Sequence, residues 1–171
     1  MKLRWIEKQA EREAKRDRMK TSDRIGNLVS VIVSIVITIF FYGNYSGNTG
    51  LFTSSFTNAD AALFFGAAIF GMAPAAARFL IGRRNPTRLL DALTAAFFLI
   101  VVVWFLATYP FDMSHLADLL PNGWHGLLSW VSDNFVKALM VIGIVASVFI
   151  IPYTILLYQA VRRKLKAPVA S

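Results

Sequence analysis

The sequence predicts an all-α integral membrane protein, a bundle of four transmembrane helices, on two observations. First, 56% of the 171 residues are hydrophobic, above the roughly 45–50% of globular chains, and the excess lies in a few long apolar runs. Second, almost all Lys and Arg flank these runs, as they do where basic loops set membrane orientation. The net charge of +8 is therefore attributed to topology. Nucleic acid is not expected as a partner, because the aromatic residues lie in the apolar runs and not among the basic ones.

The charge distribution predicts that both ends of the chain are cytoplasmic. Of the 18 Lys and Arg, nine lie in residues 1–24, four in 78–91 and four after 161, so only Lys137 would face outward. The cytoplasmic parts then carry 17 Lys/Arg and six Asp/Glu, a net of +11, and the outer parts one Lys and four Asp, a net of −3. Because a Lys/Arg bias near span ends sets orientation, we expect a protein of the plasma membrane with cytoplasmic N- and C-termini.

Residues 1–24 are expected to form a basic amphipathic helix at the cytoplasmic surface. Leu3, Ile6, Ala10 and Ala14 recur three to four residues apart, which places one narrow apolar stripe on a helix. A solvated positive tail that only sets orientation fits the same composition.

Four apolar runs make up the predicted transmembrane domain, residues 25–161. The first is rich in Val and Ile, but a lone strand cannot satisfy its backbone in lipid, so the run is expected to be helical. Asn85 followed by Pro86 has the residue types of a helix N-cap and first turn, and is expected to start the third span. A basic tail, 162–171, follows the last span. The expected spans are about 25–42, 61–81, 89–109 and 136–161.

The segment 110–135, between the third and fourth spans, is semi-polar with a helical pattern. Asp112 can cap one short helix, and Pro121 and the residues after it break that helix before a second one. Trp124 and Trp130 are of a type that prefers the membrane interface. We expect a short interfacial helical pair on the outer surface. A re-entrant loop is the alternative, tolerated only against a cavity or buried in protein.

Small and hydroxyl residues mark the faces that would pack against other helices or line a pore. Such residues let helices approach closely or hydrogen-bond across a contact, and rings of polar groups can also line a permeation pathway, so both interpretations stay open. The repeat of four residues in the first span puts its hydroxyls on one face. The candidates are Ser30, Ser34 and Thr38 in the first span, Gly66, Ala67 and Gly71 in the second, and Gly143 and Ser147 in the fourth.

Arg78 and Asp91 lie on either side of a short basic turn, each about one helical turn inside its span. An interhelical ion pair at the membrane edge is one interpretation. In the other, Arg78 extends to the headgroups, and Asp91 is stabilised by the N-terminal end of its own helix dipole.

Three residues of the outer segment are weak candidates for a metal site: His115, Asp118 and His125. Histidine and carboxylate at helical spacing can bind a metal, but the sequence places no third strong ligand. Without cysteine, thiolate sites and disulfides within the chain are excluded. We therefore predict no metal site and no cofactor.

No catalytic motif is found, so the chain is not expected to be an enzyme, although the outer His/Asp segment leaves a membrane enzyme as a third hypothesis. The sequence favours a non-catalytic integral membrane subunit or scaffold of a larger membrane protein complex. Its expected partners are the lipid bilayer and other membrane subunits or further copies of itself. The alternative is a homo-oligomeric channel or small permeation pathway lined by the Ser/Thr face of the first span.

Overall fold

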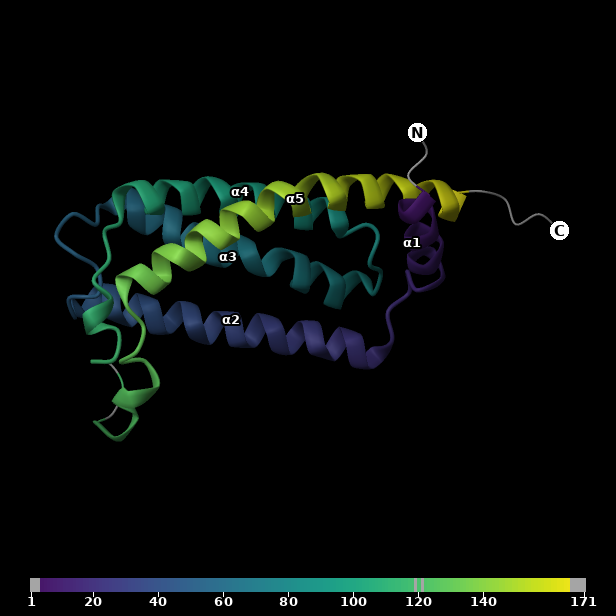
Figure 1. Ribbon diagram of the computed structural model, residues 1–171. Coiled ribbons are helices and arrows are strands. Elements are labelled where there is room, and N and C mark those ends of the chain that lie inside the picture. Colours follow the sequence, from purple (N-terminus) through teal and green to yellow (C-terminus); the bar gives the residue numbers. More distant parts are fainter. Residues whose placement is uncertain (1–3, 119, 121, 167–171) are drawn as a thin grey trace.

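The computed structural model describes residues 4–118, 120 and 122–166, and every regular element in these ranges is helical. Five α-helices follow one another along the chain, and two short 3-10 helices lie between the fourth and the fifth (Figure 1). The elements are α1 (Arg4–Lys15), α2 (Thr21–Gly47), α3 (Asn58–Ile81), α4 (Arg88–Thr108), η1 (Met113–His115), η2 (Asn122–Leu127) and α5 (Asp133–Lys166).

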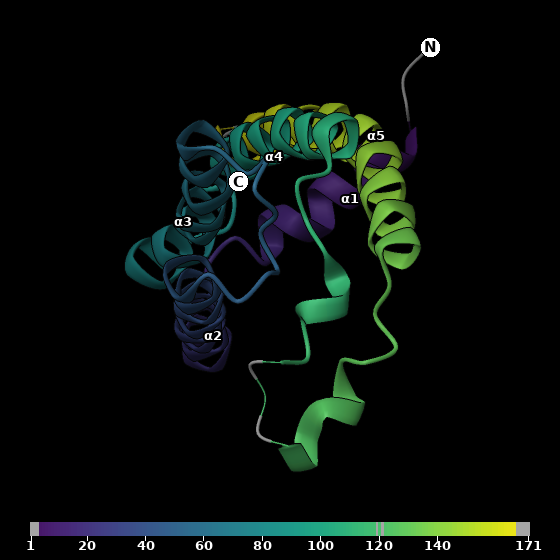
Figure 2. The ribbon, with the colours of Figure 1, turned by 90° about the vertical axis from the view of Figure 1, so that its left-hand side faces the viewer.

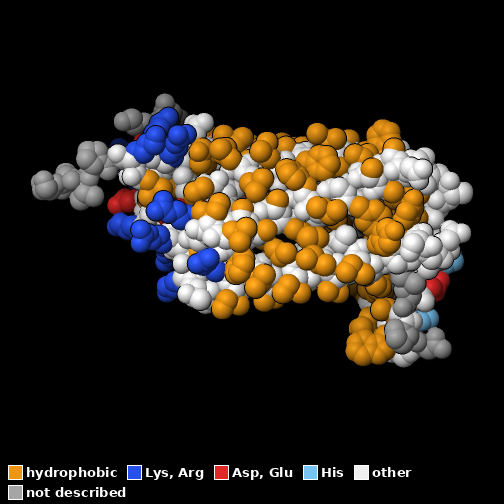
Figure 3. Space-filling model, turned by 180° about the vertical axis from the view of Figure 1, so that it is seen from behind, with side chains coloured by type: hydrophobic (Ala, Val, Ile, Leu, Met, Phe, Trp, Pro, Cys, Tyr) orange, Lys and Arg blue, Asp and Glu red, His pale blue; other side chains and the backbone are white. Residues whose placement is uncertain are grey.

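Helices α2 to α5 are each long and apolar enough to cross a membrane. Large apolar side chains on their outer faces remain uncovered: Ile39 is 63% exposed and Phe149 is 70% exposed. Figure 3 shows these side chains as a band along the molecule, with Lys and Arg gathered at one end. A soluble protein rarely exposes so extensive an apolar surface, so the structure indicates a membrane protein.

The four long helices pack in chain order and leave the bundle open on one side. α2 packs on α3, α3 on α4, and α4 on α5. Seen along the bundle, they form a C with its gap between α2 and α5 (Figure 2). α1 lies across one end of the bundle, where Ala10 packs against Leu157 and Val161 of α5. We call this the basic end; it also contains the turn 82–87 between α3 and α4.

Helices α2, α3 and α5 are longer than the predicted spans, whereas α4 has the predicted length. α3 begins at Asn58, not near residue 61, because Thr57 and Asp60 form a capping box: Asp60 Oδ2 accepts from Thr57 N at 2.8 Å, and Thr57 Oγ1 accepts from Asp60 N at 3.3 Å. The predicted helix start at Asn85 is wrong. α4 begins at Arg88, after a turn in which Arg88 N donates to Asn85 O at 3.2 Å.

Two short 3-10 helices lie where the helical pair was expected. Asp112 caps η1, accepting from Ser114 N at 3.0 Å and from the Ser114 hydroxyl at 2.6 Å. These two bonds hold the pKa of Asp112 below its ordinary value, and the bond from the Ser114 hydroxyl has the larger effect. Residues 119 and 121 lie outside the described ranges.

An aromatic cluster closes the end opposite the basic end. Phe111 lies at its centre, with ring centroids 5.1 Å from Phe105 and 5.8 Å from Phe52. Backbone bonds join the two loops that carry these rings, since Asp112 N donates to Leu51 O at 2.9 Å. The cluster therefore ties the α2–α3 loop to the chain that leaves α4.

Gly50, in the α2–α3 loop, tests how much this closure contributes to stability. Its φ is +96°, and an added Cβ would lie 2.8 Å from His115 Cδ2. We expect Gly50→Ala to lower the free energy of unfolding by about 1–3 kcal/mol, measured as a lower melting temperature by circular dichroism in detergent. Gly43→Ala is the control: Gly43 is helical with no atom within 4 Å of an added Cβ, so this change should raise stability slightly. Equal melting temperatures for the two variants would contradict the prediction.

Candidate functional site

Two cavities lie in the interior of the open bundle. The first, of about 560 Å³, has a size typical of ligand pockets, and side chains from all four long helices line it. Its wall is almost entirely apolar, and Phe105 and Phe111 close it toward the aromatic cluster. We call it the apolar cavity.

The predicted hydroxyl face of the first span contributes two of its three residues to the apolar cavity. Ser34 and Thr38 line it, whereas Ser30 is exposed and does not. The Ser34 hydroxyl donates to Ser30 O at 2.9 Å, and the Thr38 hydroxyl donates to Ser34 O at 2.7 Å. Because these donors already have partners on their own helix, the cavity presents a surface suited to an apolar occupant.

Three of the small residues predicted to pack helices line the apolar cavity. Ala67, Gly71 and Gly143 line it, and a Cβ added at Gly71 would meet no atom within 4 Å. Gly66, on the same helix, also has open space around it but does not line the cavity. Ser147 is buried in α5.

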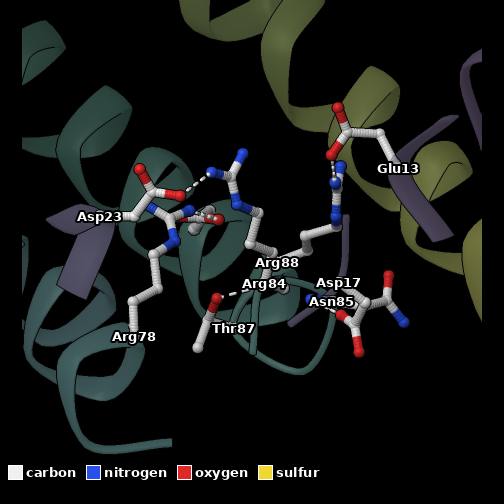
Figure 4. Close-up of polar contacts among 9 residues, drawn as sticks. Glu13, Asp17, Asp23, Arg78, Arg84, Asn85, Thr87 and Arg88 are labelled. Atoms are coloured by element: carbon white, nitrogen blue, oxygen red, sulfur yellow. Dashed lines mark hydrogen bonds and ion pairs between the residues drawn. The ribbon is translucent and has the colours of Figure 1, made fainter. Parts of the chain in front are cut away.

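The second cavity, of about 600 Å³, lies at the basic end. We call it the polar cavity. Arginine and carboxylate side chains from α1 to α4 and the intervening turn make up half of its lining residues (Figure 4). Ile150, Tyr153 and Leu157 of α5 form an apolar wall on the remaining side.

Each of three arginines around the polar cavity pairs with a carboxylate on a different element. Arg88 Nη2 of α4 lies 2.6 Å from Glu13 Oε2 of α1. Arg84 Nη2 of the turn lies 2.8 Å from Asp23 Oδ2 of α2. The structure also brings Arg78 of α3 and Asp91 of α4 together as an interhelical ion pair. These pairs link α1 to α4, the turn to α2, and α3 to α4.

Backbone contacts beside the ion pairs fasten the α1–α2 connection to the α3–α4 turn. Asp17 is buried, and its Oδ1 accepts from Asn85 N at 2.8 Å while its carbonyl oxygen accepts from Arg84 N at 2.9 Å. Met19 N donates to Gly82 O at 2.9 Å. The contact between Asp17 and Asn85 was not predicted from the sequence, because the two residues are 68 positions apart and resemble ordinary solvated loop residues.

Two of the three weak metal candidates pair with each other, and the third bonds to the backbone. His115 Nδ1 lies 2.8 Å from Asp118 Oδ2, and His125 Nε2 lies 2.6 Å from the carbonyl oxygen of Leu120, to which it must donate. Within the part of the chain that the structure describes, no group of three His, Cys, Asp or Glu could hold a metal ion.

Comparison of the chain with protein-family models, with curated proteins and with solved structures found no match.

Asp17 allows a direct test of the contact between the α1–α2 connection and the turn. Asp17→Ala removes the acceptor for Asn85 N, and an unsatisfied buried N–H costs about 1–3 kcal/mol. We expect local opening of residues 16–20, measured as a roughly tenfold faster tryptic cleavage after Arg16 and Arg18, since about 1.4 kcal/mol corresponds to a factor of ten.

Asp17→Asn is the matched control, because an amide oxygen can still accept the Asn85 hydrogen bond. It should be cleaved at close to the rate of the unmodified protein. If Asp17→Ala is cleaved no faster than Asp17→Asn, the hydrogen bond does not hold the connection in place.

Proposed function

We propose that the chain is a non-catalytic subunit or scaffold of a larger membrane protein complex. In this proposal it crosses the bilayer four times, and both ends lie in the cytoplasm, with the basic end on that side. The observation that carries the proposal is the open bundle, in which the gap between α2 and α5 leads to a cavity of apolar and small residues.

A transmembrane helix of a partner subunit is the occupant that this gap fits best. Helices associate in lipid through close van der Waals packing, for which small residues are favoured. Ala67, Gly71 and Gly143 supply such a surface, and among the described residues no atom of another helix lies within 4 Å of a Cβ added at Gly71. Ser34 and Thr38 have satisfied hydroxyls, so a partner's apolar side chains could lie against them without leaving a donor unpaired.

The outer face of α1 offers a second contact for the same partner. Ile6 and Ala10 are buried, while charged residues of both signs on the opposite face are exposed. A mixed charged face of this kind suits a polar contact with a soluble part of the partner. The basic amphipathic helix would then serve as a cytoplasmic docking element beside the membrane.

A homo-oligomeric channel is the second candidate. Ser34 and Thr38 line the interior of the bundle, which favours a pathway along α2. The rest of that wall is apolar, and both hydroxyls donate to their own helix, which leaves few groups to replace the hydration of an ion. We therefore place the subunit proposal first.

The mass of the native assembly tests the proposed function. Extraction in mild detergent followed by native mass spectrometry should give this chain with other polypeptides in a fixed ratio. Gly71→Leu should release them, because the added side chain fills the apolar cavity. It should leave the fold intact, because an added Cβ meets no atom within 4 Å and leucine has the better helix propensity.

Gly66→Leu is the matched control on the same helix, outside the apolar cavity, and should keep the partners. A lone monomer from unmodified protein would contradict the subunit proposal. A ring of identical chains would favour the channel instead, and Ser34→Leu should then reduce ion flux into liposomes.

The absence of native cysteine makes the proposed orientation testable by labelling single introduced thiols. Ser54→Cys lies in the α2–α3 loop and Ser22→Cys at the start of α2, both at exposed positions. On intact cells, a membrane-impermeant maleimide should label Ser54→Cys only. Ser22→Cys should react only after permeabilisation. The reverse pattern would invert the proposed topology.

A further inference from the structure

We propose that the polar cavity at the basic end binds the phosphate group of an anionic phospholipid from the adjoining leaflet. The proposal goes beyond the subunit function, and it rests only on the membrane topology proposed above. Arg78, Arg84 and Arg88 are the groups that would contact the phosphate.

The three guanidinium groups have donors to spare. Arginine carries five N–H donors, yet each of these residues makes its ion pair through one terminal nitrogen, Nη2. The Nε atoms of Arg84 and Arg88 are buried and have no hydrogen-bond partner among the residues that the structure describes. Guanidinium groups favour two-point binding to carboxylate or phosphate, so the present one-point pairs leave capacity for a further anion.

The charge around the cavity favours an anion. Residues 13–24 and 78–91, which form this end with the last turns of α5, carry nine Lys/Arg against four Asp/Glu, a net of +5. The carboxylates neutralise the three cavity arginines one to one, and the remaining cations give the region a positive potential. Basic pockets between transmembrane helices at the cytoplasmic side are suited to anionic headgroups.

The residues that line the polar cavity favour a lipid over a free ion. α2 and α5 are the two helices that flank the gap in the bundle (Figure 2). Both contribute residues to the lining of the polar cavity. Ile150 and Leu157 give one side an apolar wall, which fits the glycerol end of the acyl chains and has no role for inorganic phosphate. Trp5 stacks on Tyr153, another residue of that wall, with ring centroids 5.8 Å apart. Tryptophan and tyrosine are preferred at headgroup depth.

Lipid titration of the delipidated full chain in mild detergent, followed by native mass spectrometry, tests the proposal. Phosphatidylglycerol should bind with one lipid per chain, and diacylglycerol, which has no phosphate, should not. Millimolar inorganic phosphate should not displace the bound lipid. Displacement by inorganic phosphate, or equal binding of diacylglycerol, would overturn the proposal.

Two variants should shift the affinity in opposite directions. Arg88→Gln removes one cation and should weaken phosphatidylglycerol binding by about fivefold, the factor for roughly 1 kcal/mol per cationic group. Asp91→Asn removes the carboxylate that competes for Arg78, so it should tighten binding by a similar factor. A role in folding alone would predict that both variants weaken binding.

Arg12→Gln is the control for non-specific attraction, because Arg12 is exposed on α1 and does not line the cavity. Its affinity should equal that of the unmodified protein, and circular dichroism should confirm the helical content of each variant. If Arg88→Gln fails to fold, the affinity of Asp91→Asn for phosphatidylglycerol still tests the proposal. Unchanged or weaker binding by folded Asp91→Asn would overturn the proposal.

Discussion

Hydrocarbon offers no hydrogen-bond partner to a peptide group, and this constraint shapes the bundle at every level. It makes each apolar run a helix, even the Val- and Ile-rich α2, whose composition would favour a strand in water. Several hydroxyl groups follow the same rule, since those of Ser34, Thr38 and Thr108 each donate to a carbonyl on their own helix. The Thr94 hydroxyl is an exception, because it is buried with no partner among the described residues. Ser34 and Thr38 are thus compatible with lipid without any partner helix.

The same constraint moves the specific tertiary contacts to the two ends of the bundle. Apolar side chains gain little by leaving lipid for one another, so the middle of the bundle can stay open. At the basic end, Asp23 pairs with Arg84, and Arg24 Nε donates to Phe79 O at 2.9 Å. At the other end, the aromatic cluster around Phe111 holds the loops together. Because contacts at both ends of the bundle hold α2 in place, α2 does not need to pack against α5. The gap between α2 and α5 can therefore remain open.

Sequence reasoning recovered what depends on composition and missed what depends on contacts between distant segments. Long apolar runs gave the four membrane-spanning candidates, because transfer to lipid is a property of each run alone. The Thr57 and Asp60 capping box is local and could have been read as the start of α3. The contact between Asp17 and Asn85 could not be predicted in this way, because each residue alone is typical of a solvated loop. Gly71 shows a further limit, since one small-residue pattern fits both a tight helix contact and a cavity.

Paired charges at the basic end would allow arginines to lie at a membrane edge and still bind the proposed ligand. An unpaired guanidinium in a poorly solvated site is costly, whereas a paired one is tolerated. Glu13, Asp23 and Asp91 supply that pairing in the protein by itself. A lipid phosphate could accept hydrogen bonds from arginine N–H groups that have no partner, or from N–H groups that already donate to a carboxylate. Each arginine would therefore keep an anionic partner throughout binding. The carboxylates would then set the affinity of the site, which is why removing one of them is expected to strengthen binding.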